Sequence, residues 1–364
     1  MRPRTKALTA AVAGTALGVA GLAVLAMPAD AGDEPELPAI SADELVESVL
    51  SAEPPAFAGT VAVDNELGIP EIPGMDFADT DSARVYHDGD QRGRISVQRG
   101  TGEQTIVRDA EGVWTYDSGE NTATWYALPA DAAERHPVPR DAALGDRTLG
   151  HRTLGDPAAA ATEMIDKLSE SSTILVDGTA RVADRPAYEL VLTPKPSERT
   201  LLREIKVAID SETRLPLRFQ VLPNGSADPV LSVGFTDFSV GDQPDELFTF
   251  SPPEGATVVE GGAREHGQDG KDADAVAAKA ALTVVGDGWD AVLTGNLPGD
   301  APSGEREGTD PRALLEQVGE RVTGEFGSGY VITTRAGTGL LSDDGRFAVG
   351  LVPQQVLIEA LDTP

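Results

Sequence analysis

The chain has 364 residues, of which 40% are hydrophobic, and its 39 glycines and 26 prolines indicate many turns and favour β structure over helical bundles. It contains no cysteine, which excludes a disulfide framework, a thiolate metal site and a cysteine nucleophile. Its net charge of −31 would repel the phosphates of nucleic acid, so we expect no nucleic-acid partner.

The N-terminus carries the pattern of a secretory signal. The first six residues include three bases, an uncharged apolar run covers residues 7–27, and the small-residue site Ala29-Asp30-Ala31 follows. We expect residues 1–31 to be a cleaved signal peptide and the mature protein to be secreted, in an extracytoplasmic compartment such as the cell envelope. The alternative is an uncleaved membrane anchor, because the apolar run is long enough to span a bilayer.

The first element predicted after the signal is a helix. Ser41 can cap its N-terminus, and Glu44 completes the capping-box pattern. Four apolar residues at helical spacing would form its buried face: Leu45, Val46, Val49 and Leu50. Strands are then predicted in chain order at "PPAFAGTVAVDN", Ala83–Tyr86, Gly93–Gln98, Gln104–Arg108, Val113–Tyr116 and Thr124–Leu128.

An irregular loop over residues 131–156 separates these strands from a second predicted helix. That helix begins at Asp156-Pro157, an N-cap residue followed by proline at the first helical position. Its apolar face would be formed by Ala161, Met164, Ile165 and Leu168.

Four successive runs then alternate apolar and polar residues with period two. Turn-forming stretches separate the runs, and no helix long enough for a parallel crossover intervenes. We therefore predict an antiparallel sheet with one apolar and one solvated face. The apolar sets are Tyr188, Leu190 and Leu192; Ile205, Val207 and Ile209; Leu217, Phe219 and Val221; and Leu231, Val233 and Phe235.

The C-terminal quarter is predicted to be a separate region. The polar, Gly-rich stretch Gly261 to Ala275 indicates a linker, and residues 276–364 indicate a small α+β piece. Its expected elements are a helix around Ala275–Leu282, a short strand near Trp289–Leu293, a helix capped by Asp310-Pro311 with Leu314, Leu315, Val318 and Val322 on its face, and a hairpin of Ala336–Leu341 with Arg346–Val352.

The sequence contains no pattern that indicates catalysis. No two of the four histidines have metal-ligand spacing, and the acidic stretch "DGKDAD" lacks the spacing and the closing glutamate of a calcium loop. A phosphate-binding loop, a nucleophile elbow and a zinc-protease motif are also absent from the sequence. We therefore predict a protein that is not an enzyme and that has no cofactor and no metal site.

One short stretch, "GVWTYDSGENTATWYALP", holds two of the three tryptophans and two of the five tyrosines. The polar turn "DSGEN" between the aromatic residues predicts a hairpin in which aromatic side chains pair across the strands. Such a hairpin could cover the edge of the core or border a ligand, and the pattern leaves both interpretations open.

Several quoted segments together resemble a known family. They are "PPAFAGTVAV", "RISVQRGTGEQTIVRDAEGVWTYDSGENTATWYALP", "VDGTARVADRPAYELVLTPK", "IKVAIDSETRLPLRFQV" and "GFTDFSVGDQPDELFTFSPPEGATV". In this order they resemble the secreted lipoprotein-carrier superfamily of LolA, LolB and RseB-type proteins, and its actinobacterial members most of all. The resemblance covers about Ser41 to Val259. It implies an incomplete, half-open antiparallel β-barrel plugged by helices, which we assign to residues 32–260.

The resemblance also implies a function. Family members bind acyl chains on the concave face of the barrel, so we expect a non-enzymatic carrier or binding protein for a lipid or a lipoprotein acyl chain. The alternative is an RseB-like sensor that docks an envelope protein such as a membrane regulator. The residues expected to line the cavity are Trp114, Tyr116, Trp125, Leu190, Val207, Ile209, Phe219 and Phe235.

Overall fold

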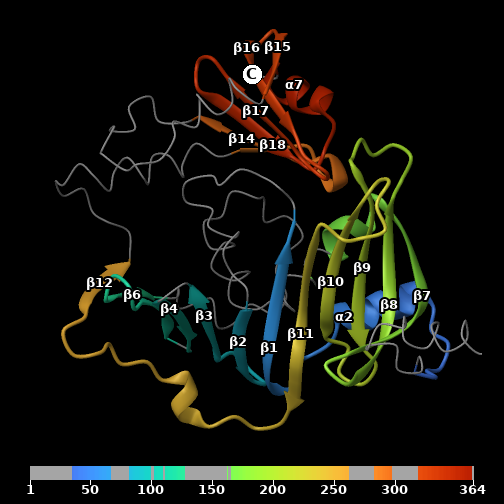
Figure 1. The fold of residues 1–364 in the computed structure, drawn as a ribbon. Helices are drawn as coiled ribbons and strands as arrows, with labels where there is room; N and C mark the ends of the chain where they lie inside the picture. Colours follow the sequence, from blue (N-terminus) through green and yellow to red (C-terminus); the bar gives the residue numbers. More distant parts are fainter. Residues whose placement is uncertain are drawn as a thin grey trace, which may run out of the picture.

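The computed structural model contains two antiparallel sheets (Figure 1). It describes residues 35–66, 82–99, 102–109, 111–127, 162, 165–261, 283–296 and 319–362. The predicted signal peptide and the loop at 131–156 lie outside these residues, as does most of the predicted linker. Among the helices of the described part, none has the length and apolar character that crossing a membrane requires.

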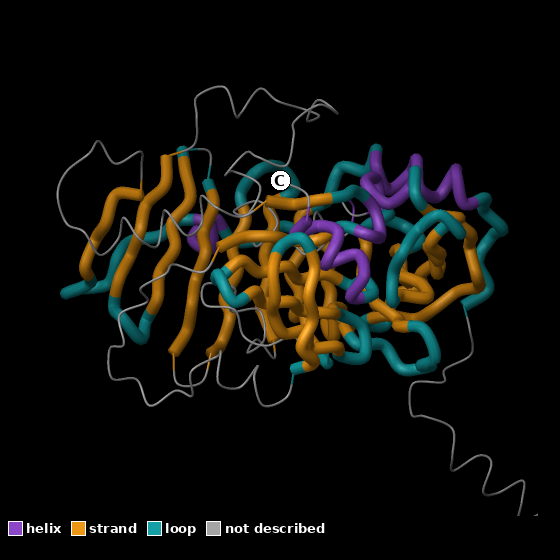
Figure 2. The backbone as a smooth tube through the Cα atoms, turned by 90° about the horizontal axis from the view of Figure 1, so that it is seen from above, coloured by secondary structure: helices purple, strands orange, loops and turns teal. Residues whose placement is uncertain are grey.

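The larger sheet has twelve strands in the order β12-β6-β5-β4-β3-β2-β1-β11-β10-β9-β8-β7. The strands are β1 (Ala56–Asn65), β2 (Ser82–Asp88), β3 (Gly93–Arg99), β4 (Gly102–Arg108), β5 (Gly112–Asp117), β6 (Thr122–Ala127), β7 (Ser172–Val182), β8 (Arg185–Pro194), β9 (Leu202–Asp210), β10 (Pro216–Pro223), β11 (Leu231–Val240) and β12 (Thr257–Gly261). Strands β2–β6 lie side by side as an open wing, whereas β7–β10 curl around at the other end (Figure 2). The sheet is not closed, which confirms the predicted half-open barrel.

One pair in this sheet departs from the antiparallel pattern. Strand β12 joins the edge strand β6 in parallel, with Thr257 opposite Thr122. A connection that contains the 3-10 helix η1 (Asp245–Phe248) leads from β11 at the centre of the sheet to β12 at its edge. Parallel pairing is possible here because the five strands β7–β11 lie between β6 and β12 in sequence, so the connection is long enough without a helical crossover.

Helices plug the curled end of the half-barrel, as predicted. Helix α2 (Ala42–Leu50) begins after Ser41, whose Oγ accepts a hydrogen bond from the N–H of Glu44 at 3.2 Å. Residues 165–169 are also helical. Leu45 and Val49 of α2 pack with Ile165 and Leu168 in the first core cluster. Ala161 and Met164, predicted on the same face as Ile165, lie outside the described residues.

The predicted apolar inner set is confirmed in β8 and β9, but the opposite face is not wholly solvated, because Ala187, Val191 and Ala208 are buried there as well. Leu190 pairs with Val207 on the inner face, while on the outer face Glu189 accepts a hydrogen bond from Lys206 at 2.7 Å. Leu217 departs from the pattern, because the pairing of β10 with β9 shifts between Pro216 and Arg218. Leu217 accordingly packs in a second core cluster, which forms around Phe57, Val61 and Phe235, whereas Val221 packs in the first cluster.

The C-terminal sheet has six strands in the order β13-β14-β18-β17-β16-β15. The strands are β13 (Thr283–Val285), β14 (Val292–Asn296), β15 (Glu320–Gly324), β16 (Gly327–Thr333), β17 (Thr338–Ser342) and β18 (Arg346–Gly350), with η2 (Gly288–Asp290) before β14 and α7 (Gln354–Asp362) at the end. The predicted final hairpin is confirmed as β17–β18.

Two predictions in the C-terminal region were wrong, and one element was not predicted. Val322 lies in strand β15 and pairs with Gly329 of β16, so it is not on a helix face. Val322 and Thr323 are β-branched residues that suit a strand, and this preference outweighed the helical spacing. Trp289 lies in η2 rather than in a strand, and the sequence reading missed α7 entirely.

The two sheets are joined by polar contacts as well as by the core. The N–H of Leu201 and the hydroxyl of Thr200 both donate to the carbonyl of Leu351, at 2.9 and 2.8 Å. Two exposed ion pairs also connect the two parts: Arg199 with Glu359, and Arg335 with Glu66. Figure 1 shows the C-terminal sheet against one end of the larger sheet.

These contacts lead to a prediction about limited proteolysis. Brief digestion should cut within Gly261–Ala275 and leave a fragment that ends near Val259. Because the contacts between the sheets do not depend on that segment, the two fragments should co-elute in size-exclusion chromatography. Separate elution of the fragments would contradict this, and early cleavage within Tyr188–Phe235 would contradict the sheet assignment.

Candidate functional site

At the curled end of the half-barrel, side chains on the inner face of the sheet pack into a closed core. Leu190, Val207 and Ile209 each have 0% of their surface exposed, and they pack in the same cluster as α2. Phe219 is partly buried against that cluster. The inner-face residues predicted from sequence are therefore brought together, with the plugging helices lying over them.

Phe235 belongs to the second core cluster, further along the same face. Its ring contacts Phe57 in an edge-to-face arrangement with centroids 6.0 Å apart, and Phe238 with centroids 5.0 Å apart. Phe57 is fully buried. This cluster continues the apolar inner face from β11 across β1 and β2.

The three aromatic residues of the hairpin lie on the other face of the sheet. Cross-strand pairs connect Trp114 to Ala58 of β1 through Val107, Arg94 and Tyr86. Phe235 pairs with Val61, three positions from Ala58 on the same strand. Since successive residues of a strand point to opposite faces, Trp114 and Phe235 lie on opposite sides of the sheet. The structure does not bring Trp114, Tyr116 and Trp125 together with the inner-face residues.

On that opposite face the hairpin has its own aromatic partner. Trp114 and Trp125 pair across the strands with ring centroids 5.0 Å apart. Phe250, from the connection between β11 and β12, lies 5.4 Å from Trp114 and 5.7 Å from Tyr116. This arrangement attaches the connection to the wing, which is a structural role for the hairpin.

A pocket of about 520 Å³ lies where the plug meets the edge of the half-barrel, between α2 and β7. Its apolar lining comes from Val46 and Leu50 of α2 and Ile174 of β7. Its polar lining consists of two carboxylates and three hydroxyls: Asp43, Glu47, Ser51, Ser169 and Ser172. Leu45 and Val49 of α2 face the core, and Val46 and Ile174 of the pocket wall also pack against the first core cluster, so the pocket lies at the edge of that cluster.

One residue of the pocket wall is also a contact between the two sheets. The indole Nε1–H of Trp289 donates a hydrogen bond to Ser172 Oγ at 2.8 Å, and both side chains are buried. Trp289 packs in the first core cluster together with Leu45 and Val49. Sequence reasoning missed this role, and the one available signal was a large aromatic residue within the turn-forming stretch "GDGWD".

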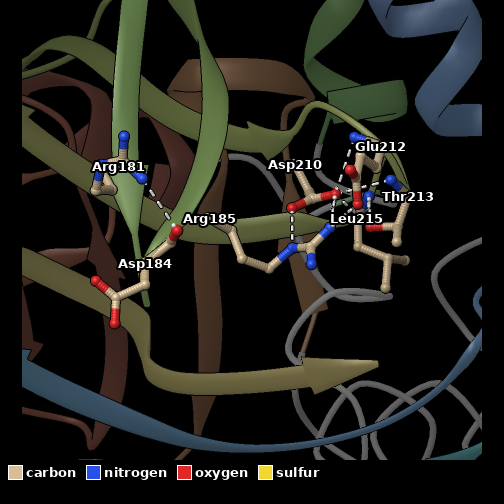
Figure 3. A network of polar contacts seen from close by, with 7 residues as sticks. All are labelled: Arg181, Asp184, Arg185, Asp210, Glu212, Thr213 and Leu215. Atoms are coloured by element: carbon tan, nitrogen blue, oxygen red, sulfur yellow. Dashed lines mark hydrogen bonds and ion pairs between the residues drawn. The ribbon is translucent and has the colours of Figure 1, made fainter. Parts of the chain in front are cut away.

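A separate polar network lies at the end of β9 (Figure 3). The carboxylate of Asp210 is completely buried and accepts hydrogen bonds from the side chain of Arg185, from the N–H groups of Glu212 and Thr213, and from the Thr213 hydroxyl. Burial alone would raise the pKa of Asp210, but the Arg185 guanidinium and the two N–H groups outweigh it and hold that pKa below 3.8. The network fixes the turn between β9 and β10, and none of its residues lines the pocket.

The model of the MucB/RseB N-terminal domain matches residues 80–249, which run from the start of β2 to the end of η1 and so cover most of the half-barrel. This match agrees with the resemblance of the chain to the superfamily of LolA, LolB and RseB-type proteins. A comparison with curated proteins gave no match.

Solved structures with similar folds include MucB in complex with MucA(peri), at 17% identity and a TM-score of 0.44 over 88% of this chain and 97% of that one. The Pseudomonas aeruginosa MucA/MucB complex follows at 18% identity and a TM-score of 0.42, over 87% and 94%. A LolA superfamily protein from Nitrosomonas europaea gives 12% identity and a TM-score of 0.23, over 58% and 99%.

Proposed function

We propose that this protein is an exported, non-enzymatic binding protein for an apolar ligand, such as a lipid or the acyl chain of a lipoprotein. The observation that carries the proposal is the pocket between α2 and β7. Its volume of about 520 Å³ lies within the range of ordinary ligand sites, roughly 300–1,000 Å³. Three apolar side chains line it, and burial of an alkyl chain against such a surface contributes about 0.8 kcal/mol per CH₂.

In this proposal the ligand first occupies the pocket and not the deep inner face. Leu190, Val207 and Ile209 are already fully buried beneath α2, so they have no free surface to offer while the helix stays in place. They form the wall behind the helix. A charge at Val207 would therefore unfold the protein rather than test ligand binding.

A second candidate is an RseB-like module that docks an envelope protein such as a membrane regulator. The family model that matches the chain supports this candidate, since it describes the MucB/RseB side of the superfamily. The packed inner face supports it as well, because a filled barrel suits docking better than carriage. Bound apolar ligand in the purified protein would favour the first candidate, and a protein partner without any ligand would favour the second.

The proposal can be tested with a matched pair of substitutions. Leu50 lines the pocket and is 44% exposed, while Leu175, one residue beyond the pocket-lining Ile174, is 42% exposed and does not line it. Titration of delipidated protein with 1-dodecanol should saturate. Leu50→Glu should weaken binding by at least about tenfold, or ~1.4 kcal/mol, because it places a charge beside the chain.

The control Leu175→Glu should leave the affinity within about twofold, since it changes charge and exposure in the same way outside the pocket. Circular dichroism must show both variants folded. If wild type fails to bind the alcohol, or if both variants lose affinity equally, the pocket is not the site.

A further inference from the structure

The pocket combines apolar walls with an acidic rim. Asp43 and Glu47 are one helical turn apart on α2, and both are exposed at the pocket beside Val46 and Leu50. Within the part of the chain that the structure describes, no lysine, arginine or histidine lines this pocket. A ligand whose apolar chain lies against Leu50 would therefore have its polar head next to two carboxylates.

This arrangement discriminates between head groups. An anionic head, such as a fatty-acid carboxylate, would be repelled by both rim residues. A cationic head would be attracted by both, and a neutral hydroxyl could hydrogen-bond to the carboxylates or to a pocket serine without an electrostatic penalty. The net charge of −31 acts in the same direction at long range, but salt screens it, whereas the rim acts at contact distance.

The pocket also has a structural connection to the C-terminal sheet. Ser172 lines the pocket and accepts the hydrogen bond from Trp289 at 2.8 Å. Helix α2 contacts both the pocket and Trp289's cluster. A molecule that enters the pocket therefore touches the residue and the helix that hold the indole.

We propose that the pocket between α2 and β7 selects an amphiphile with a single apolar chain and a cationic head, and that Trp289 responds to its occupancy through Ser172. This rests on the proposed function and narrows it to one ligand chemistry. The C-terminal region is then the part of the molecule that registers the bound ligand, since Trp289 lies in η2, just before β14 of the C-terminal sheet.

The test uses three probes with the same C12 chain: dodecylamine, 1-dodecanol and dodecanoate, each below its aggregation concentration and at pH 7. Calorimetric titration of the full-length mature chain should give the order dodecylamine, then dodecanol, then dodecanoate. The amine should bind at least about tenfold more tightly than the carboxylate, as expected for a head group beside two exposed charges.

The rim residues supply the decisive variant. Asp43→Asn with Glu47→Gln should remove most of the preference for the amine and leave dodecanol affinity within about twofold. The matched control is Asp237→Asn with Glu254→Gln, which neutralises two exposed carboxylates that do not line the pocket. If the control reduces the preference as much as the rim variant does, general attraction by an acidic surface explains it and the inference is wrong.

Trp289 is tested in the same titrations. Saturation with dodecylamine should change tryptophan emission in wild type, and the change should be lost in Trp289→Phe. If Trp289→Phe shows the same change in emission as wild type, Trp289 does not respond to occupancy. If dodecanol binds but the three probes show no order of head groups, this inference fails while the proposed function stands. If none of the probes binds, the proposed function itself fails.

Discussion

Replacing Trp289 by alanine should lower the free energy of unfolding by about 3–5 kcal/mol, the usual cost of deleting a buried large aromatic side chain. Trp289 is only 4% exposed, lies in the first core cluster and donates to Ser172. Its loss leaves a cavity between the two sheets and a buried serine hydroxyl without that donor. After cleavage in the linker, the fragments of this variant should separate, unlike those of wild type.

Urea denaturation followed by circular dichroism measures the effect on unfolding. The matched control is Trp114→Ala, the same change at a partly buried position on the outer face of the wing. We expect the control to cost clearly less than Trp289→Ala. Equal losses, or fragments that still co-elute without Trp289, would show that this residue does not hold the sheets together.

Replacing Asp210 by alanine should cost about 3 kcal/mol, the lower end of the range for breaking a buried ion pair. The substitution leaves Arg185, whose side chain is 20% exposed, with only the exposed Glu212 as its ion-pair partner, and it also removes the acceptor for the N–H groups of Glu212 and Thr213. Glu212→Gln is the matched control, since Glu212 is 74% exposed and contacts the same guanidinium. That control should cost less than about 1 kcal/mol.

The same carboxylate makes stability depend on pH. Because the pKa of Asp210 in the folded protein lies below 3.8, folding favours its ionised form. Its contribution is complete above about pH 5 and is lost as the pH falls through 4 and below. Urea denaturation at several pH values should show a smaller acid-induced loss in Asp210→Ala than in wild type. An identical acid dependence in the two proteins would contradict the assignment.

Local features were predictable from the sequence. The cap at Ser41 depends on residues within one helical turn, and the alternation of Tyr188, Leu190 and Leu192 is a property of a single strand, so both could be predicted without knowing the fold. The hairpin around "DSGEN" was predictable for the same reason: Asp117 Oδ1 accepts from the N–H groups of Gly119 and Glu120 within the turn itself.

The candidate site could not be predicted in the same way, because it depends on contacts between residues that are far apart in the sequence. Whether Trp114 shares a face with Phe235 is decided by the pairing registers of every strand between β5 and β11, and a shift of one residue in any of them exchanges the faces. The role of Trp289 depends on contact with Ser172, which is 117 residues away in sequence. No local pattern encodes such a contact, so the role of Trp289 could not be predicted from the sequence.

A native mass spectrum of the mature protein purified from its own host tests the central claim most directly. If the half-barrel binds an apolar ligand, the spectrum should contain a second species heavier than the chain by the mass of a lipid or an amphiphile with one apolar chain. Leu50→Glu should lack that species and Leu175→Glu should retain it. A spectrum with the bare chain alone, from protein that also binds none of the C12 probes in titration, would contradict the account and favour a module that docks another protein.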